Sequence, residues 1–241
     1  MKRFLALAAL VLLLPAGSAL AGGFSFSTSF TPRGFGDLAD AFGAAIAFPN
    51  LATAAASGVA GFDVLAVAGG PQVDTGASWW RSAVDARTIG GILPSYRAIV
   101  RKGLPGGVDV GAQFGRVAGE EFWGGELRYN VWDGGVLAPA AAVRLAYARL
   151  TGSAVALDVT EAQVVVSKGF TVVSPYVAAG YARTTAEARF GDPIPIRHRV
   201  QHDRWSGVVG VRLAIAPFAH LVAEVRRGTA TSVAVGVGVG L

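Results

Sequence analysis

The last eleven residues of the chain alternate strictly between two kinds of side chain. Large aliphatic residues face small ones: Val233, Val235, Val237, Val239 and Leu241 against Ala234, Gly236, Gly238 and Gly240. A repeat of two residues is the period of a β-strand, so this segment has one apolar face and one nearly bare face. Glycine at every second position weakens a strand that faces water. The pattern favours a strand whose bare face looks into a crowded barrel and whose valine face meets lipid.

The chain as a whole is apolar, yet its apolar residues are dispersed. Hydrophobic residues make up 52% of its 241 residues, and the mean hydropathy is +0.48. No stretch reaches the about 18 consecutive apolar residues expected of a membrane-spanning helix. Alternating strands reconcile these two facts, because each strand contributes only half of its residues to the apolar face. Since only helices and closed barrels pair every backbone polar group in hydrocarbon, a membrane barrel is predicted.

The N-terminal residues have the features of an export signal. A basic start is followed by an apolar run over 4–14 and by the small-x-small cleavage site Ala19-Leu20-Ala21. The apolar run is too short to cross a bilayer as a helix. We therefore expect three parts: a signal peptide at 1–21, a helical segment at 22–60 and a transmembrane β-barrel at 61–241. Export and a barrel together indicate the bacterial outer membrane.

The segment at 22–60 contains a helical pattern between residues 36 and 56. Its apolar residues recur at helical spacing, and Asp37 is suited to cap the start. Pro49 and Asn50 are expected to divide the pattern into two short helices. Two locations stay open for this segment, which are the periplasm and the barrel lumen, where it would act as a plug.

From residue 61 onward the sequence predicts an all-β, antiparallel, up-and-down barrel of about ten strands, with eight to twelve compatible with the pattern. The expected strands are 61–69, 95–102, 107–118, 121–133, 137–150, 154–168, 173–188, 203–216, 218–227 and 230–241. Short connections alternate with longer ones, of which 70–94 and 189–202 are the longest, and 70–94 is expected to hold a short helix at Trp79-Trp80. Short inner turns and longer outer loops are typical of outer-membrane barrels.

Aromatic residues recur near the ends of the predicted strands, where they are expected to form interfacial girdles. They are Tyr96, Trp123, Trp132, Tyr147, Tyr176 and Trp205. One strand is less regular, because Leu157 and Val159 share a face with Glu161 and Gln163. A bulge or a change of register is expected in that strand.

Charged residues recur on the bare faces of the predicted strands and are the main functional lead. Those expected to face the lumen are Glu126, Arg128, Arg144, Glu161, Arg212, Glu224 and Arg226. Because buried charges need partners, one interpretation is a salt-bridged network that holds a narrow barrel together. The other is a polar path or binding site for a small solute. A wide open pore is not expected, because barrels of about eight strands are filled by side chains.

Few residues are arranged for catalysis or metal binding. The absence of cysteine excludes thiolate chemistry. His198 and His202 lie four residues apart in the predicted loop 189–202, but that loop contains prolines and offers no third ligand. His202 and Ser206 would suit a hydrolase only with a third group to orient the base. We predict no catalytic residue, no metal and no cofactor.

Short motifs along most of the chain from about residue 37 resemble a family of bacterial outer-membrane β-barrel proteins of similar length, for which no activity is established. The matching segments are Gly61-Phe62-Asp63-Val64, Lys102-Gly103-Leu104-Pro105, Val108-Asp109-Val110-Gly111, Gly125-Glu126-Leu127-Arg128-Tyr129, Ala142-Val143-Arg144, Ser167-Lys168-Gly169-Phe170 and Pro175-Tyr176. The resemblance implies the barrel fold and the outer-membrane location, and it implies no particular chemistry.

Three functions follow as hypotheses. The favoured one is a non-catalytic outer-membrane barrel with a structural role or a narrow-channel role for a small solute. The alternatives are a barrel-embedded enzyme that acts on lipid or peptide at the outer rim, and a soluble exported β-sandwich that binds a ligand. The expected partners are outer-membrane lipid, the barrel-assembly machinery and a small solute. Nucleic acid is not expected, because the net charge of +5 is not gathered into a large basic cluster.

Overall fold

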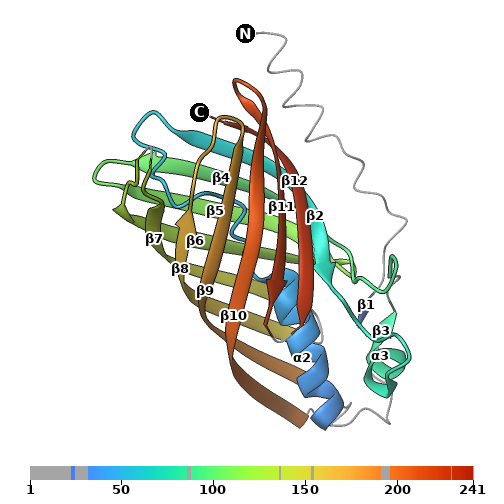
Figure 1. Cartoon of the computed structure of the whole chain (residues 1–241). Helices are drawn as coiled ribbons and strands as arrows, with labels where there is room; N and C mark the ends of the chain where they lie inside the picture. Colours follow the sequence, from blue (N-terminus) through green and yellow to red (C-terminus); the bar gives the residue numbers. More distant parts are fainter. Residues whose placement is uncertain are drawn as a thin grey trace.

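Ten antiparallel strands close into one barrel in which β12 pairs with β2 (Figure 1). The computed structural model describes residues 23–24, 32–85, 88–135, 137–152, 155–190, 196–228 and 230–240. The predicted signal peptide at 1–21 lies outside these residues. The barrel strands are β2 (Phe62–Pro71), β4 (Ser95–Leu104), β5 (Val108–Val117), β6 (Glu120–Trp132), β7 (Ala140–Thr151), β8 (Val155–Ser167), β9 (Val173–Phe190), β10 (Ile196–Ala216), β11 (Ala219–Arg227) and β12 (Thr231–Gly240).

The predicted barrel of about ten strands is confirmed, and the alternative of a β-sandwich is wrong. Every barrel strand pairs with two neighbours, so one sheet closes on itself. A sandwich would require two sheets packed face to face. None of the described helices is both long and apolar enough to cross a membrane.

The two ends of the barrel differ. At the short-turn end, connections such as 105–107 and 217–218 join the strands, β2 begins and β12 ends. At the long-loop end lie the helix α3 (Ser78–Ala83) and the short strand β3 (Val84–Asp85), which pairs with β1 (Gly23–Phe24). The hairpin of β9 and β10 also projects at this end, because β10 pairs with β11 only from Gly207 onward.

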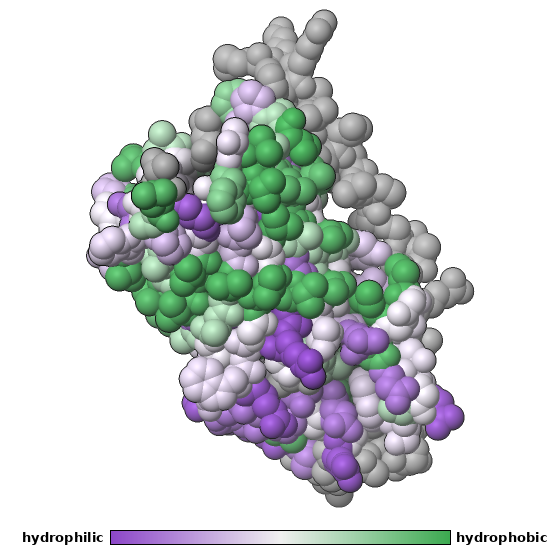
Figure 2. Space-filling view, viewed as in Figure 1, coloured by the Kyte–Doolittle hydropathy of each residue, from purple (hydrophilic) through white to green (hydrophobic). Residues whose placement is uncertain are grey.

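The outer wall carries an apolar band. Figure 2 shows hydrophobic residues across the middle of the barrel and hydrophilic residues gathered toward the long-loop end. Near that end, several strands carry an outward aromatic residue and, two residues closer to the long loops, a charged residue that pairs with a charge on the neighbouring strand. The aromatic residues are Phe114, Trp123, Tyr147, Tyr181 and Trp205, and the charged pairs are Arg116–Glu121, Arg149–Asp158 and Arg183–Asp203. This order is the one expected where an apolar band meets polar surroundings.

The aromatic residues at that boundary contact one another, since Trp123 meets Tyr147 and Tyr181 meets Trp205 edge to face, with ring centroids 5.7 and 5.9 Å apart. Just beyond them, Arg183 donates bonds of 2.7 and 3.1 Å to the carboxylate of Asp203, and these bonds hold the pKa of that carboxyl below its usual value. At the short-turn end, Trp132 is exposed at the end of β6, and Phe170 and Phe218 are exposed in the connections between strands. The expectation for Tyr176 is wrong, because that side chain is buried inside the barrel.

Two further expectations about the strands are corrected. The predicted loop 189–202 is largely strand, because β9 extends to Phe190 and β10 begins at Ile196, opposite it. The strand β8 has no bulge, and its register with β7 and β9 is continuous. Inward and outward positions alternate along the whole of β8. The inward side chains change from apolar, at Leu157 and Val159, to polar, at Glu161, because the two parts of the strand pack on different parts of the chain.

The N-terminal helix α2 (Pro32–Ile46) lies in the long-loop end of the barrel (Figure 1). It begins at Pro32, ahead of the expected start near Asp37, because proline fits the first turn of a helix. The expected second helix is wrong. After Pro49 the backbone is irregular, and Leu51 has a positive φ of 41° that an α-helix excludes.

Candidate functional site

The interior of the barrel is occupied by the N-terminal part of the chain, and we call residues 32–61 the plug. Its helical half packs through one apolar face, formed by Phe35, Leu38, Phe42 and Ile46, all of which are fully buried. This face belongs to a cluster with inward residues of the wall such as Phe122, Leu150 and Leu157. Burying a large apolar side chain is worth about 1.5–3 kcal/mol, so apolar contacts dominate the attachment of α2.

The wall satisfies the last carbonyl groups of α2, which have no partner within the helix. Arg97 of β4 donates to the carbonyl of Ala47 at 2.7 Å and to that of Ala45. Gln113 of β5 donates to the carbonyl of Ile46 at 2.9 Å. A cation at a helix C-terminus also interacts favourably with the helix dipole. The end of α2 is therefore fixed to two neighbouring strands.

Deeper in the barrel, guanidinium groups from several strands hold the irregular half of the plug by its carbonyl oxygens. Arg144 of β7 and Arg226 of β11 both donate to Phe48, at 2.7 and 3.0 Å. Arg101 of β4 donates to the carbonyl of Asn50 at 2.7 Å. These bonds come from different sides of the barrel, so the plug is held at its centre.

Arg128 and Asn130 of β6 extend this set of donors toward the short-turn end. Arg128 contacts the side-chain oxygen of Asn50 at 2.6 Å and the carbonyl of Thr53 at 2.5 Å. Asn130 donates to the carbonyl of Ala54 at 2.7 Å. One strand thus follows the plug over several successive residues.

The N–H groups of the plug are satisfied by acceptors on the wall. Glu224 of β11 accepts from the amides of Asn50 and Leu51, at 3.3 and 2.9 Å. Ser167 of β8 accepts from the amide of Ala54 at 2.8 Å. Asp109 of β5 accepts from the amide of Ser57 at 3.2 Å. An irregular segment inside a barrel is tolerated only when its backbone groups are paired in this way.

The charged side chains that hold the plug also pair with one another. Glu126 lies at the centre, where it accepts bonds from Arg101 and from Arg144, the latter at 2.6 Å, and lies 3.8 Å from Arg128. Glu161 pairs with Arg226 and lies 3.5 Å from Arg144. Each of these charges therefore has an oppositely charged neighbour, which lowers the cost of burying it.

The structure brings six of the seven sequence-predicted residues together around the plug, namely Glu126, Arg128, Arg144, Glu161, Glu224 and Arg226, and all six are buried. Arg212 lies elsewhere, toward the short-turn end, where it is 3.4 Å from Asp63 and 3.2 Å from the ring of His220. Asp63 in turn lies 3.3 Å from His220. The predicted set therefore divides into a central group and a smaller one.

Sequence reasoning missed two arginines of β4 that take part in the central group. Arg97 and Arg101 share the inward face of that strand with Ile99, and this apolar neighbour obscured the pattern. The outward residues Tyr96 and Val100 could have indicated which face of the strand is the inner one. Because a strand alternates, outward residues at even positions place Arg97 and Arg101 inside.

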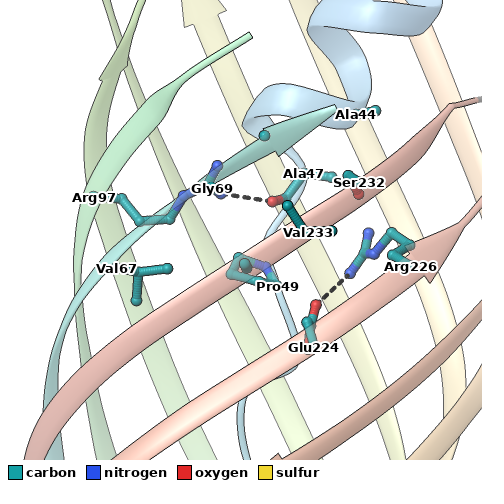
Figure 3. A pocket seen from close by; sticks show the side chains of 12 residues that line it. Ala44, Ala47, Pro49, Val67, Gly69, Arg97, Glu224, Arg226, Ser232 and Val233 are labelled. Carbon is teal, nitrogen blue, oxygen red and sulfur yellow. Dashed lines mark hydrogen bonds and ion pairs between the residues drawn. The ribbon is translucent and has the colours of Figure 1, made fainter. Parts of the chain in front are cut away.

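A small cavity adjoins the plug. A cavity of about 20 Å³ lies between the end of α2 and the wall, and Figure 3 shows Ala47, Pro49, Arg97, Glu224 and Arg226 around it. A cavity needs about 10–15 Å³ to hold one water molecule. This space therefore accommodates about one water molecule and no larger solute.

The residues considered for catalysis have separate partners. His202 bonds through Nδ1 to Asp40 of α2 at 2.6 Å, and His198 contacts the ring of Phe35. Ser206 accepts a hydrogen bond of 3.3 Å from Gln163. Within the described part of the chain, no three histidine or carboxylate groups are placed to hold a metal ion. His198 and His202 thus serve to join α2 to the projecting part of β10.

The inward glycines make room for the large side chains of the network. A Cβ added at Gly210 of β10 would lie 2.2 Å from the ring of Tyr176, whose hydroxyl donates to Glu224 at 3.0 Å. Gly207 of the same strand faces outward and has nothing within 4 Å of such an atom. Both positions lie in extended strand, so the two differ mainly in the space available.

We expect Gly210→Ala to lower the free energy of unfolding by about 1–3 kcal/mol, because the added methyl group displaces Tyr176 from Glu224. Gly207→Ala is the matched control and is expected to change it by less than about 0.5 kcal/mol. Urea titrations of the two variants folded in detergent, followed by the gel shift between folded and unfolded bands, measure the difference. Equal stabilities would contradict the close packing at Gly210.

Comparisons with known proteins concern the fold. No protein-family model and no curated protein sequence matches the chain. Among solved structures, the N-terminal β-barrel domain of Pseudomonas aeruginosa OprF is 12% identical and has a TM-score of 0.41, covering 76% of this chain and 99% of that domain. The KdgM porin is 8% identical with a TM-score of 0.39, covering 73% of this chain and 98% of the porin. Neisserial surface protein A is 15% identical with a TM-score of 0.34, covering 75% and 96%.

Proposed function

We propose that the chain is an integral protein of the bacterial outer membrane with a structural, non-catalytic role, and that its lumen is closed by its own N-terminal segment. The apolar band of the wall supports insertion into lipid, because such a band flanked by aromatic residues matches a bilayer. On β6, the aromatic residues Trp123 and Trp132 mark the two edges of the band. At ~3.3 Å per residue and a tilt of about 40° they lie about 23 Å apart along the barrel axis, near the ~25 Å expected.

The proposal of a closed lumen is supported mainly by the series of hydrogen bonds from the wall to the backbone of the plug. Donors or acceptors reach the plug from β4, β5, β6, β7, β8 and β11, and they do so at successive depths of the lumen. The cavity beside them is too small for a solute. A narrow-channel role would therefore require the plug to move, whereas a structural role requires no change.

A structural role also agrees with the hydrogen bonds that the charged side chains of the lumen make. The arginines and glutamates of the lumen use their hydrogen bonds on the plug and on each other, so they are already engaged rather than arranged around an empty site. Lipid of the outer membrane is the proposed partner of the wall. The barrel-assembly machinery is the proposed partner during insertion, as for any barrel of this membrane.

Conductance of the intact chain tests this proposal. After folding in detergent is verified by a shifted unboiled gel band, the protein is reconstituted into planar bilayers and into liposomes loaded with a small dye. We expect no single-channel steps and no loss of dye, because the plug occupies the lumen and is bonded to the wall along its length. Steady conductance of the folded chain would refute the closed state.

A further inference from the structure

The plug runs through the barrel in one direction, as the residues along β4 that bind its successive parts show. Arg97, near the long-loop end of β4, binds the carbonyls of Ala45 and Ala47. Arg101, four residues further along β4, binds the carbonyl of Asn50 at 2.7 Å. Lys102 binds the carbonyls of Val59 and Gly61 near the short-turn end. From helix to wall, the chain therefore descends from the long-loop end to the short-turn end, where it enters β2 at Phe62.

The start of the plug, at α2, consequently lies at the long-loop end. The helix α2 is anchored there to the projecting part of β10 through His202–Asp40 and through the ring contact of Phe35 with His198. Further toward the N-terminus, Gly23 and Phe24 pair with Asp85 and Val84, which belong to the insertion between β2 and β4 at the same end. Two independent attachments thus hold α2 and Gly23–Phe24 at the long-loop end, away from the end where β12 finishes.

We propose that the barrel exports its own N-terminal segment through its lumen and displays Gly23–Phe24 and the start of α2, where Arg33 is exposed, on the cell surface. The inference rests on the proposed outer-membrane location, in which short turns face the periplasm and longer loops face outward. It adds a second role to the structural one, because the lumen serves as the passage for a segment of the chain and the wall charges line that passage. The polar bonds to backbone atoms suit such a role, since they depend little on the side chains that pass.

The absence of cysteine from the chain makes this topology testable with single-cysteine variants. Arg33→Cys places a thiol on an exposed position of the first turn of α2, Thr75→Cys places one in the insertion at the long-loop end, and Pro105→Cys places one in the turn between β4 and β5. Cells that express each full-length variant are treated with a membrane-impermeant maleimide, before and after the outer membrane is permeabilised.

We expect the variants at Arg33 and Thr75 to be labelled on intact cells, and the variant at Pro105 to be labelled only after permeabilisation. Labelling of Thr75→Cys on intact cells while Arg33→Cys reacts only after permeabilisation would overturn the display of the start of α2 and leave the outer-membrane location intact. If all three variants react only after permeabilisation, the proposed surface orientation itself is wrong. Heat-modifiability of each variant shows that the labelled protein is the folded barrel.

Discussion

Replacing Glu126 by alanine is expected to lower the free energy of unfolding by about 3–5 kcal/mol, because the change leaves buried cations without their counter-charge. Arg101, Arg128 and Arg144 surround this carboxylate, and none is more than 5% exposed. Their remaining bonds to plug carbonyls do not neutralise them. The loss should appear as a large decrease in the urea concentration at which the folded gel band disappears.

Glu121 provides a matched control on the same strand. It faces outward and pairs with Arg116, and both side chains are more than half exposed. Exposed ion pairs contribute about 1 kcal/mol at most, so Glu121→Ala should have a small effect. Equal losses in the two variants would contradict a buried network centred on Glu126. A double variant that also replaces Arg144 should lose less stability than the sum of the two single losses, because the two side chains interact directly.

A disulfide between positions 43 and 184 is expected to form and to stabilise the folded chain strongly. A Cβ added at Gly43 of α2 would lie 3.4 Å from the Cβ of Thr184 on β9. Disulfides join Cβ atoms about 3.5–4.5 Å apart, so Gly43→Cys with Thr184→Cys nearly meets the geometry. The bond closes a loop of more than a hundred residues, for which the chain-entropy model gives about 4–5 kcal/mol.

The reduced form of this double variant is its own reference for stability, because it has the same side chains without the cross-link. The oxidised form should keep its folded band at higher temperature than the reduced form. Gly43→Cys paired with Gly207→Cys is the spatial control, because Gly207 faces outward from the barrel. This control pair should stay reduced within one molecule.

The barrel wall was predictable because its signals lie in side chains. Alternation of Trp123, Leu127 and Tyr129 with Glu126 and Arg128 fixed the inner and outer faces of β6, and the structure agrees. The bare face of the last strand has an equally direct reason. A Cβ at Gly238 would lie 2.5 Å from His220, so the glycines of β12 leave room for neighbouring side chains.

The position of the plug was not predictable, because backbone atoms make its contacts. The wall arginines bind the carbonyls of Ala45, Ala47 and Phe48. Every residue has a backbone carbonyl, so the sequence does not indicate which of them are bound. Pro49 correctly indicated the end of a helix, but the carboxylate of Glu224 satisfies the amides after it and replaces the expected second helix. The strand at 196–202 was missed because its pairing with the far end of β9 is identified only by the fold.

Cross-linking of Gly43→Cys with Thr184→Cys is the measurement that tests most directly whether the N-terminal segment occupies the lumen. The full-length double variant is folded in detergent, oxidised, denatured and treated with a maleimide that carries a mass tag. An intramolecular disulfide leaves no thiol to react, so the account predicts an untagged monomer that gains two tags after reduction. A folded monomer that carries two tags without reduction would show that α2 lies away from β9, and it would contradict a plugged barrel.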